Sequence, residues 1–122
     1  MNVNERIRFT SHLGKQILLV DLSHCPAATV EEIARKVPDL VSTQPLRSVL
    51  ILAEFTGAAF NAETLRAMKE AAVFDKPYIK KTAWVGAEDI PREYTKSLSN
   101  YSLREFPSFK NREEALAWLV QD

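Results

Sequence analysis

The 122-residue chain has little of several residue types that fix a scaffold or a chemistry by themselves. Cys25 is the only cysteine, so no disulfide can form within the chain and a disulfide scaffold is excluded. The two histidines, His12 and His24, are too few to supply an evident set of metal ligands. We therefore expect neither a structural metal nor a bound cofactor.

The chain also lacks an excess charge and a long apolar run. Its 16 basic and 16 acidic residues cancel, so no bulk field favours nucleic acid or an anionic membrane. The longest apolar stretches, "ILLV" and "VLILA", are far too short to cross a bilayer. The first residues, "MNVNERIRF", contain no apolar segment of signal-peptide length, so we expect a cytoplasmic protein without a transmembrane segment.

What the chain does have is the composition of a folded domain. Apolar residues make up 46% and charged residues 26% of the sequence, values that are ordinary for soluble globular proteins. A chain of this length fits one domain and can bury a core without a metal or a disulfide. We find no repeat and no linker, and we predict a single domain over residues 1–122.

Three segments have the hydrophobic patterns of the first strands of a sheet. "RIRF" alternates between apolar and basic residues, and turn residues around Gly14 predict a hairpin into "QILLVDL". That second segment and "SVLILAEF" are apolar on both faces, which is typical of central strands in a covered sheet. "KPYIKKTAWVG" and "SLREF" are predicted as two further strands.

Capping patterns mark four helices between and after these strands. Thr29 and Glu32 have capping-box spacing before an apolar stripe that Pro38 could end early or kink. Asn61 can cap the next helix, and a third runs from Asp89 and Pro91 to about Ser99. Asn111 and Glu114 repeat the capping spacing before "EEALAWLV". The predicted order is β-β-α-β-α-β-α-β-α, an α/β fold with a mixed, mostly parallel sheet of about five strands and about four helices.

This order, together with "RSVLILAEFTGAAFNAETLRAMKEAA" and the ending "FPSFKNREEALAWLV", resembles the SpoIIAA-like family. That family belongs to the wider STAS group and is also compared with CRAL-TRIO lipid-binding domains. The resemblance covers nearly the whole chain and rests on the pattern of strand, small loop, helix and C-terminal helix. It implies a STAS-type fold and either a bacterial-type regulatory domain or a pocket for an apolar ligand.

The chain departs from STAS anti-sigma-factor antagonists in the loop before the second helix. The matching loop in those proteins carries Asp-Ser-Ser-Gly or a near variant, and one of its serines is phosphorylated. Aligned on Leu65, this chain has Asn61, Ala62, Glu63 and Thr64 instead, so Glu63 takes the place of the phosphorylated serine. The resemblance therefore does not carry the phosphorylation switch to this chain.

The same loop is the first candidate site, because ligands in α/β proteins usually bind where strands end and helices begin. Its candidate ligand-binding or partner-binding residues are Thr56, Gly57, Phe60, Asn61, Glu63 and Thr64. The alternative is a purely structural helix cap, since one glycine makes no phosphate-binding fingerprint and an acidic Glu63 repels an anion. We favour the cap.

Two further clusters have both a functional and a structural interpretation. Asp21, His24 and Cys25 follow a strand and suggest a nucleophile, but a lone cysteine is more often packed in a core. Strand alternation groups Tyr78, Lys80 and Trp84 on one face, which is suitable for a head group, a nucleotide or a partner. The alternative there is a lysine stem that covers aromatic rings at a sheet surface.

The sequence contains no paired-carboxylate, H-E-x-x-H or G-x-S-x-G motif, so an enzyme is the least supported class. The leading prediction is a non-catalytic regulatory or protein-interaction module of STAS type, forming a homodimer, with a regulatory protein partner. The alternative is a binder of a small apolar or lipid-like molecule in a CRAL-TRIO-like pocket. Its residues would come from a bulky set beside one strand end, namely Phe55, Phe60, Leu65 and Met68.

Overall fold

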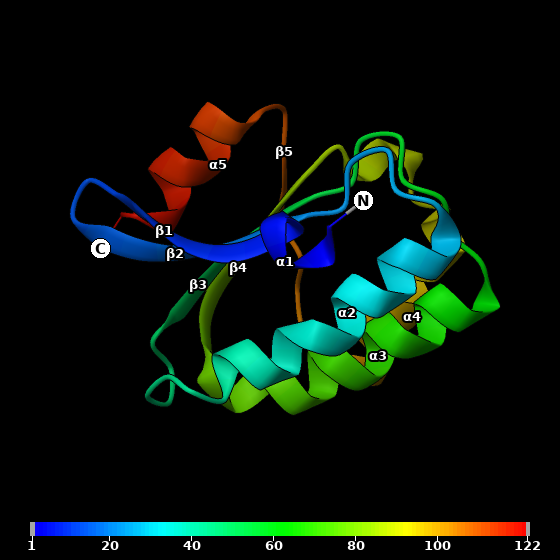
Figure 1. The fold of residues 1–122 in the computed structure, drawn as a ribbon, viewed down its shortest axis with the longest axis horizontal. Coiled ribbons are helices and arrows are strands. Elements are labelled where there is room, and N and C mark those ends of the chain that lie inside the picture. The colour runs from blue at the N-terminus through cyan, green and yellow to red at the C-terminus, as the bar shows by residue number, and fades with distance from the viewer. Residues whose placement is uncertain (1, 122) are drawn as a thin grey trace.

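A computed structural model describes residues 2–121 of the chain as an α/β fold. Within these residues a five-stranded sheet is combined with five α-helices and two short 3-10 helices (Figure 1). The strands are β1 (Ile7–His12), β2 (Lys15–Asp21), β3 (Val49–Glu54), β4 (Ile79–Val85) and β5 (Ser108–Phe109). The helices are α1 (Val3–Arg6), α2 (Ala27–Val41), α3 (Ala62–Asp75), η1 (Lys76–Tyr78), η2 (Ala87–Asp89), α4 (Arg92–Ser102) and α5 (Arg112–Leu119).

The sheet is mixed and mostly parallel, as predicted. Its strand order is β1-β2-β3-β4-β5, in which β1 and β2 are antiparallel and all later neighbours are parallel. The β1–β2 hairpin turns at Leu13 and Gly14, both with positive φ, at +50° and +81°. Two successive positive-φ residues match the right-handed twist of a two-residue hairpin. The parallel strands bring the ends of β2, β3 and β4 to one edge of the sheet.

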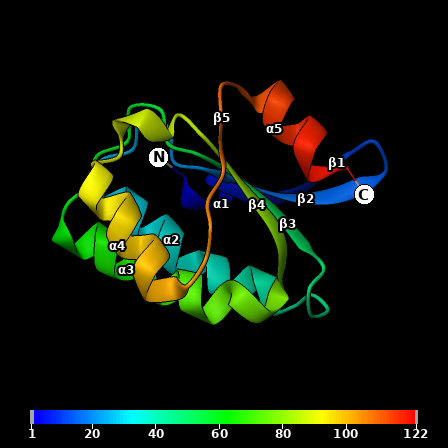
Figure 2. The same ribbon diagram turned by 180° about the vertical axis from the view of Figure 1, so that it is seen from behind.

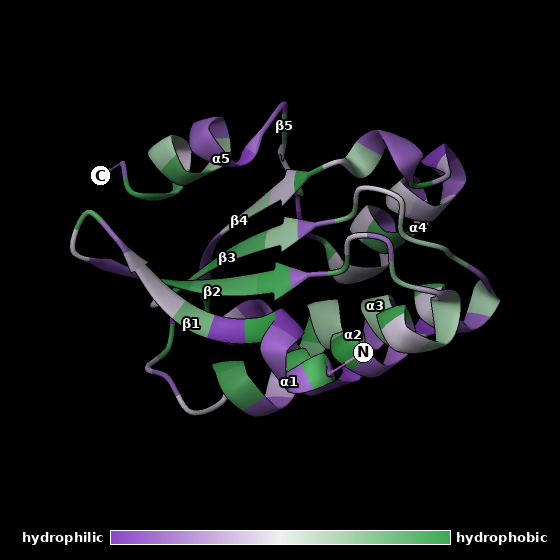
Figure 3. Cartoon of the chain, turned by 45° about the horizontal axis from the view of Figure 1, so that its top comes forward, coloured by the Kyte–Doolittle hydropathy of each residue, from purple (hydrophilic) through white to green (hydrophobic). Residues whose placement is uncertain are grey.

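Helices cover both faces of the sheet. Helices α2, α3 and α4 form a layer on one face and α5 lies on the other (Figures 1 and 2). The side chains of β2 and β3 alternate between the two layers, as their apolar sequences predict: Leu18 and Val20 pack in the core with α2, whereas Ile17 and Leu19 pack with α5. Figure 3 shows the middle of these two central strands as hydrophobic.

The covered sheet bears on the predicted homodimer, because an uncovered apolar sheet face would favour association. On the α5 side, however, Ile17, Leu50 and Leu52 are only 0%, 6% and 1% exposed. These strands therefore leave no apolar face uncovered on this side, and the homodimer stays a prediction.

Several boundaries differ from those predicted. A one-turn helix, α1, precedes the first strand and was not expected. Helix α2 starts at Ala27 without a side-chain cap, and it continues through Pro38 to Val41. Helix α4 begins after Pro91 and extends beyond Ser99 to Ser102. The last strand is Ser108–Phe109 and not "SLREF". Its two residues form a strand only by pairing with Trp84 and Val85, and this tertiary contact leaves no pattern in the local sequence.

Candidate ligand-binding cavity

The loop after β3 is held by hydrogen bonds to the neighbouring loops. The Thr56 carbonyl accepts from the His24 N–H at 2.8 Å, and the Gly57 N–H donates to Asp89 Oδ2 at 3.1 Å. Gly57 has φ of +69°, and a Cβ at this position would collide with the His24 ring. The loops after β2, β3 and β4 therefore pack together, and the Gly57 N–H is used within the protein.

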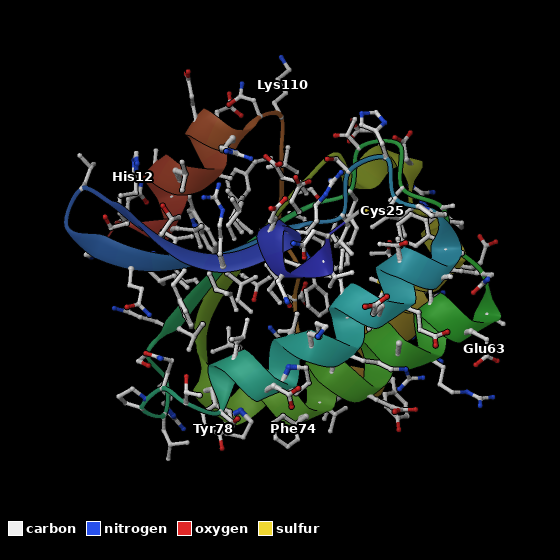
Figure 4. All side chains as sticks on the ribbon, in the orientation of Figure 1. His12, Cys25, Glu63, Phe74, Tyr78 and Lys110 are labelled. Carbon is white, nitrogen blue, oxygen red and sulfur yellow. The ribbon has the colours of Figure 1, made fainter. Side chains whose placement is uncertain are left out.

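A reciprocal capping box of Asn61 and Thr64 forms the start of α3. The Thr64 N–H donates to Asn61 Oδ1 at 2.9 Å, and the Asn61 N–H donates to Thr64 Oγ1 at 2.8 Å. Thr64 is 0% exposed, whereas Glu63 is exposed and points away from the helix layer (Figure 4). The prediction that Asn61 caps this helix is confirmed. Phe60 packs partly buried against Phe55, with ring centroids 6.0 Å apart.

The cluster at the end of β2 divides into separate structural roles. Asp21 pairs with Arg6 at 3.2 Å and accepts from the Ser23 N–H at 3.0 Å. His24 is exposed, whereas Cys25 is 1% exposed within the core. Burial raises the pKa of the Cys25 thiol, mainly by desolvation and against the favourable charge of Arg6. A raised thiol pKa disfavours the nucleophilic thiolate, which supports the structural interpretation of Cys25.

The predicted face of Tyr78, Lys80 and Trp84 is not a continuous surface. Trp84 is 3% exposed and packs between Phe55 and Phe106, with ring centroids at 4.9 and 4.6 Å. Tyr78 lies in η1 before the strand, and Lys80 is exposed at a register shift of β4 against β3. In β4 it is the neighbouring Lys81 whose ammonium group lies over a ring, at 4.9 Å from the centroid of Trp118. The expectation of an exposed aromatic face is therefore wrong for Trp84.

A cavity of about 90 Å³ lies between the sheet and helices α2, α3 and α4, and the buried Trp84 is part of its wall. Two residues of the bulky set named for an apolar ligand, Phe55 and Met68, line it. The other two, Phe60 and Leu65, pack against the same core without lining the cavity. Most of the remaining wall is aliphatic or aromatic and comes from the sheet and all three helices: Val20, Leu22, Ala34, Val37, Ile51, Ala53, Ala71, Ala72, Trp84, Leu98 and Phe106.

One end of the cavity is polar. Asp75, Thr82 and Arg104 line it there. Arg104 donates from Nη1 to the Ala72 carbonyl at 3.1 Å and from Nη2 to Thr82 Oγ1 at 2.8 Å. Its guanidinium also lies 5.0 Å from the ring centroid of Phe106. These contacts fix the guanidinium between the end of α3 and β4.

Asp75 is the unusual member of this end of the cavity. It is 3% exposed, and its Oδ1 has no hydrogen-bond partner. Burial raises the pKa of its carboxyl from 3.8 to about 7, against the opposing effect of the Arg104 charge. Burial in turn lowers the pKa of Arg104, against the opposing effect of Asp75. Buried polar atoms in proteins nearly always have a partner. The Oδ1 atom of Asp75 is therefore an acceptor that a bound molecule could use.

Sequence reasoning missed Asp75 and Arg104. A signal for Asp75 is nevertheless present in "LRAMKEAAVFD", where Met68, Ala72 and Asp75 follow one another at helical spacing on the inward face. An acidic residue in the last turn of a helix is also unfavourable in the field of the helix dipole. No comparable signal marks Arg104, because it lies in an irregular segment whose position depends on tertiary packing.

The comparisons with known proteins give no family: no protein-family model, no curated protein and no solved structure matches the chain. Among residues 2–121 no group of three or more His, Cys, Asp or Glu side chains is placed to hold a metal ion. In the same part of the chain, no helix combines the length and the apolar character needed to span a bilayer.

Proposed function

We propose that the chain binds a small, largely apolar molecule in the cavity between the sheet and helices α2, α3 and α4. The observation that carries this proposal is the unpartnered Oδ1 of the buried Asp75 at the end of an apolar cavity. Leaving a buried polar group without a partner costs about 1–3 kcal/mol, and more if it is charged. A ligand that donates a hydrogen bond to Asp75 would remove this cost in the bound state.

The two titratable groups at the polar end narrow the class of ligand. Above about pH 7, where Asp75 is ionised, an anionic group would face its carboxylate, and a cationic group would face the Arg104 guanidinium. A neutral hydroxyl group avoids both repulsions, because it can donate to Asp75 while its oxygen accepts from a neighbouring donor. The ligand class that fits is therefore a neutral molecule with a hydrocarbon body and one hydroxyl group.

The size of the cavity limits the ligand further. An engineered apolar cavity of about 150 Å³ accepts benzene, and the cavity here is about 90 Å³. Met68 lines the cavity and is only partly buried. Methionine has a flexible, unbranched side chain, so its movement would enlarge the space. We therefore expect molecules no larger than about phenol, and the wall must move at Met68 for phenol itself to enter.

Phenol and benzene provide a direct test, since they differ by the hydroxyl group alone. We expect phenol to shift the methyl NMR signals of Val20, Val37 and Ile51 and to bind about tenfold more tightly than benzene. Asp75→Leu should abolish this preference, whereas Asp75→Asn should retain much of it because the amide oxygen still accepts. Asp39→Leu, at an exposed position of α2, is the matched control. Saturating phenol without any shift of the cavity methyl signals would rule out the proposal.

The regulatory or partner-binding module remains the other proposed class for this chain. The helix start at Asn61 supports a module that is not switched by phosphorylation. The buried Thr64 hydroxyl is engaged in the cap, and Glu63 takes the place of the phosphorylated serine. The resemblance to SpoIIAA-like proteins and the homodimer belong to this second proposal. No observation at the loop favours it over the cavity.

A further inference from the structure

Strand β4 has an unpaired stretch at the outer edge of the sheet. It pairs with β3 from Ile79 to Val85, but β5 pairs only with Trp84 and Val85. The Trp84 N–H points outward, where it donates to the Pro107 carbonyl at 2.9 Å. Backbone groups alternate in direction along a strand, so the N–H and C=O of Thr82 also point outward. No strand within residues 2–121 pairs with Thr82 on this side.

A groove of about 780 Å³ runs beside this stretch. In Figure 2 the segment that joins α4 to β5 rises beside β4 and meets it only near the end of the strand. Glu105 and Pro107 of that segment form one wall of the groove, and the start of β4 forms the other. The groove thus leaves room next to a strand edge, and it differs from the apolar cavity, with which it shares only Thr82 and Arg104.

The groove is strongly basic, although the whole chain has no net charge. Among residues 2–121, five basic side chains line it, and Glu105 is the only acidic one that does so. Lys76 and Lys81 donate to carbonyl oxygens, which leave their charges uncompensated, whereas Arg104 donates to a carbonyl and a hydroxyl oxygen and lies near Asp75. The other two, Arg47 and Lys80, are exposed. Within residues 2–121, none of the five forms an ion pair with a carboxylate.

We propose that this groove binds an extended, acidic peptide segment of a partner protein, which adds to the sheet beside β4. Strand addition uses the free backbone groups of an edge strand for affinity and the flanking side chains for specificity. Here the Thr82 backbone offers one donor and one acceptor, and the surrounding lysines and arginines select carboxylates. A phosphate or a nucleic acid would satisfy the charges but has no peptide backbone to pair with the strand.

A second copy of this chain does not fit the same groove. Lysines on an edge strand hinder the pairing of identical edges, since each copy brings the same charges to the contact. In a symmetric pair, each copy would add the charges of Lys80 and Lys81 to the same contact. The charge pattern therefore favours a partner of opposite charge, and this inference does not depend on whether the cavity is occupied.

The test uses a fluorescent peptide of alternating glutamate and valine, about eight residues long, whose binding is followed by anisotropy. We expect binding that weakens as salt is added, because the contacts are exposed ion pairs. Lys80→Glu should weaken it about tenfold. Lys110→Glu is the matched control, since Lys110 is also exposed but lies at the other end of the molecule from Tyr78 and the groove (Figure 4). It should change the affinity less than about twofold.

Three further measurements separate strand addition from simple attraction between charges. A peptide with the same side chains but with N-methylated backbone amides should bind about tenfold more weakly. The Thr82 amide should exchange its hydrogen more slowly when the unmodified peptide is bound. An oligonucleotide of equal charge should not compete at equal concentration. Equal binding of the methylated peptide, unchanged exchange at Thr82, effective competition by the oligonucleotide, or no peptide binding at all would each overturn the proposal.

Discussion

Asp75 ends helix α3 at a position where several effects oppose its charge. It is buried, its Oδ1 has no partner, and it lies at the negative end of the helix dipole. Only the charge of Arg104 acts in its favour, and burial outweighs it, so the pKa of Asp75 rises to about 7. A residue placed so unfavourably for folding points to a role in binding, which is the reason that the proposed function centres on it.

The raised pKa of Asp75 makes stability depend on pH. The folded state holds the proton up to about pH 7, whereas the unfolded state releases it near 3.8. The folded state therefore loses stability as the pH rises from about 4 through about 7. The loss is at most about 4 kcal/mol, since each unit of pKa corresponds to about 1.4 kcal/mol. Asp75→Asn removes the titrating group and with it this loss.

We expect the stability advantage of Asp75→Asn over the parent protein to grow between pH 5 and pH 8, by about 3 kcal/mol at most. Urea unfolding at both pH values measures the difference in the free energy of unfolding. Asp39→Asn, an exposed aspartate on α2, should differ little from the parent at either pH. A loss of stability in Asp75→Asn at pH 8 would show that the carboxylate has favourable partners, contrary to the structure.

At the scale of the elements, helix starts depend on local sequence and can be tested locally. The cap of α3 joins the Asn61 side chain to the Thr64 N–H at 2.9 Å. Loss of such a cap costs about 1 kcal/mol, so Asn61→Ala should lower the melting temperature by about 4 °C. Asn100→Ala, at an exposed site inside α4, is the control and should not lower it, because alanine is the better helix former there. Equal effects of the two substitutions would contradict a specific role for the cap.

The elements also show what the sequence could and could not predict. The alternation in β2 and β3 placed Leu18 and Ile17 on opposite faces, because strand side chains alternate whatever their neighbours are. The same reasoning failed for "SLREF", because β5 exists only through its pairing with Trp84 and Val85. The sequence predicted Phe55 and Met68 beside an apolar ligand, and both line the cavity. It did not predict Asp75 or Arg104 at the polar end. Arg104 reaches Asp75's surroundings only through tertiary packing of an irregular segment.

At the scale of the whole molecule, the two helix layers differ in how well they fill the space against the sheet. The layer of α2, α3 and α4 leaves the cavity of about 90 Å³, which Ala71 lines from α3. On the opposite face, Ala115 of α5 is 0% exposed and packs in the second core cluster, away from the cavity. If the cavity is a site kept open for a ligand, filling it should favour stability at the expense of binding.

The pair Ala71→Met and Ala115→Met tests this difference between the layers. Both substitutions add the same flexible side chain to a buried helical alanine. Ala71→Met can extend into the cavity, so we expect it to raise the free energy of unfolding by about 1 kcal/mol, because more apolar surface is buried. It should also weaken phenol binding about tenfold or more, since it occupies the space of the ligand.

Ala115→Met has no such space beside it and should lower the free energy of unfolding by about 1–3 kcal/mol, the usual cost of overpacking. Its affinity for phenol should stay near that of the parent protein, because the sheet separates it from the cavity. Urea unfolding and NMR titration of the same two proteins provide both quantities. If Ala71→Met is destabilised as much as Ala115→Met, the helix layer over the cavity has no room to fill. If Ala71→Met instead gains stability and still binds phenol with full affinity, the ligand occupies some other part of the molecule.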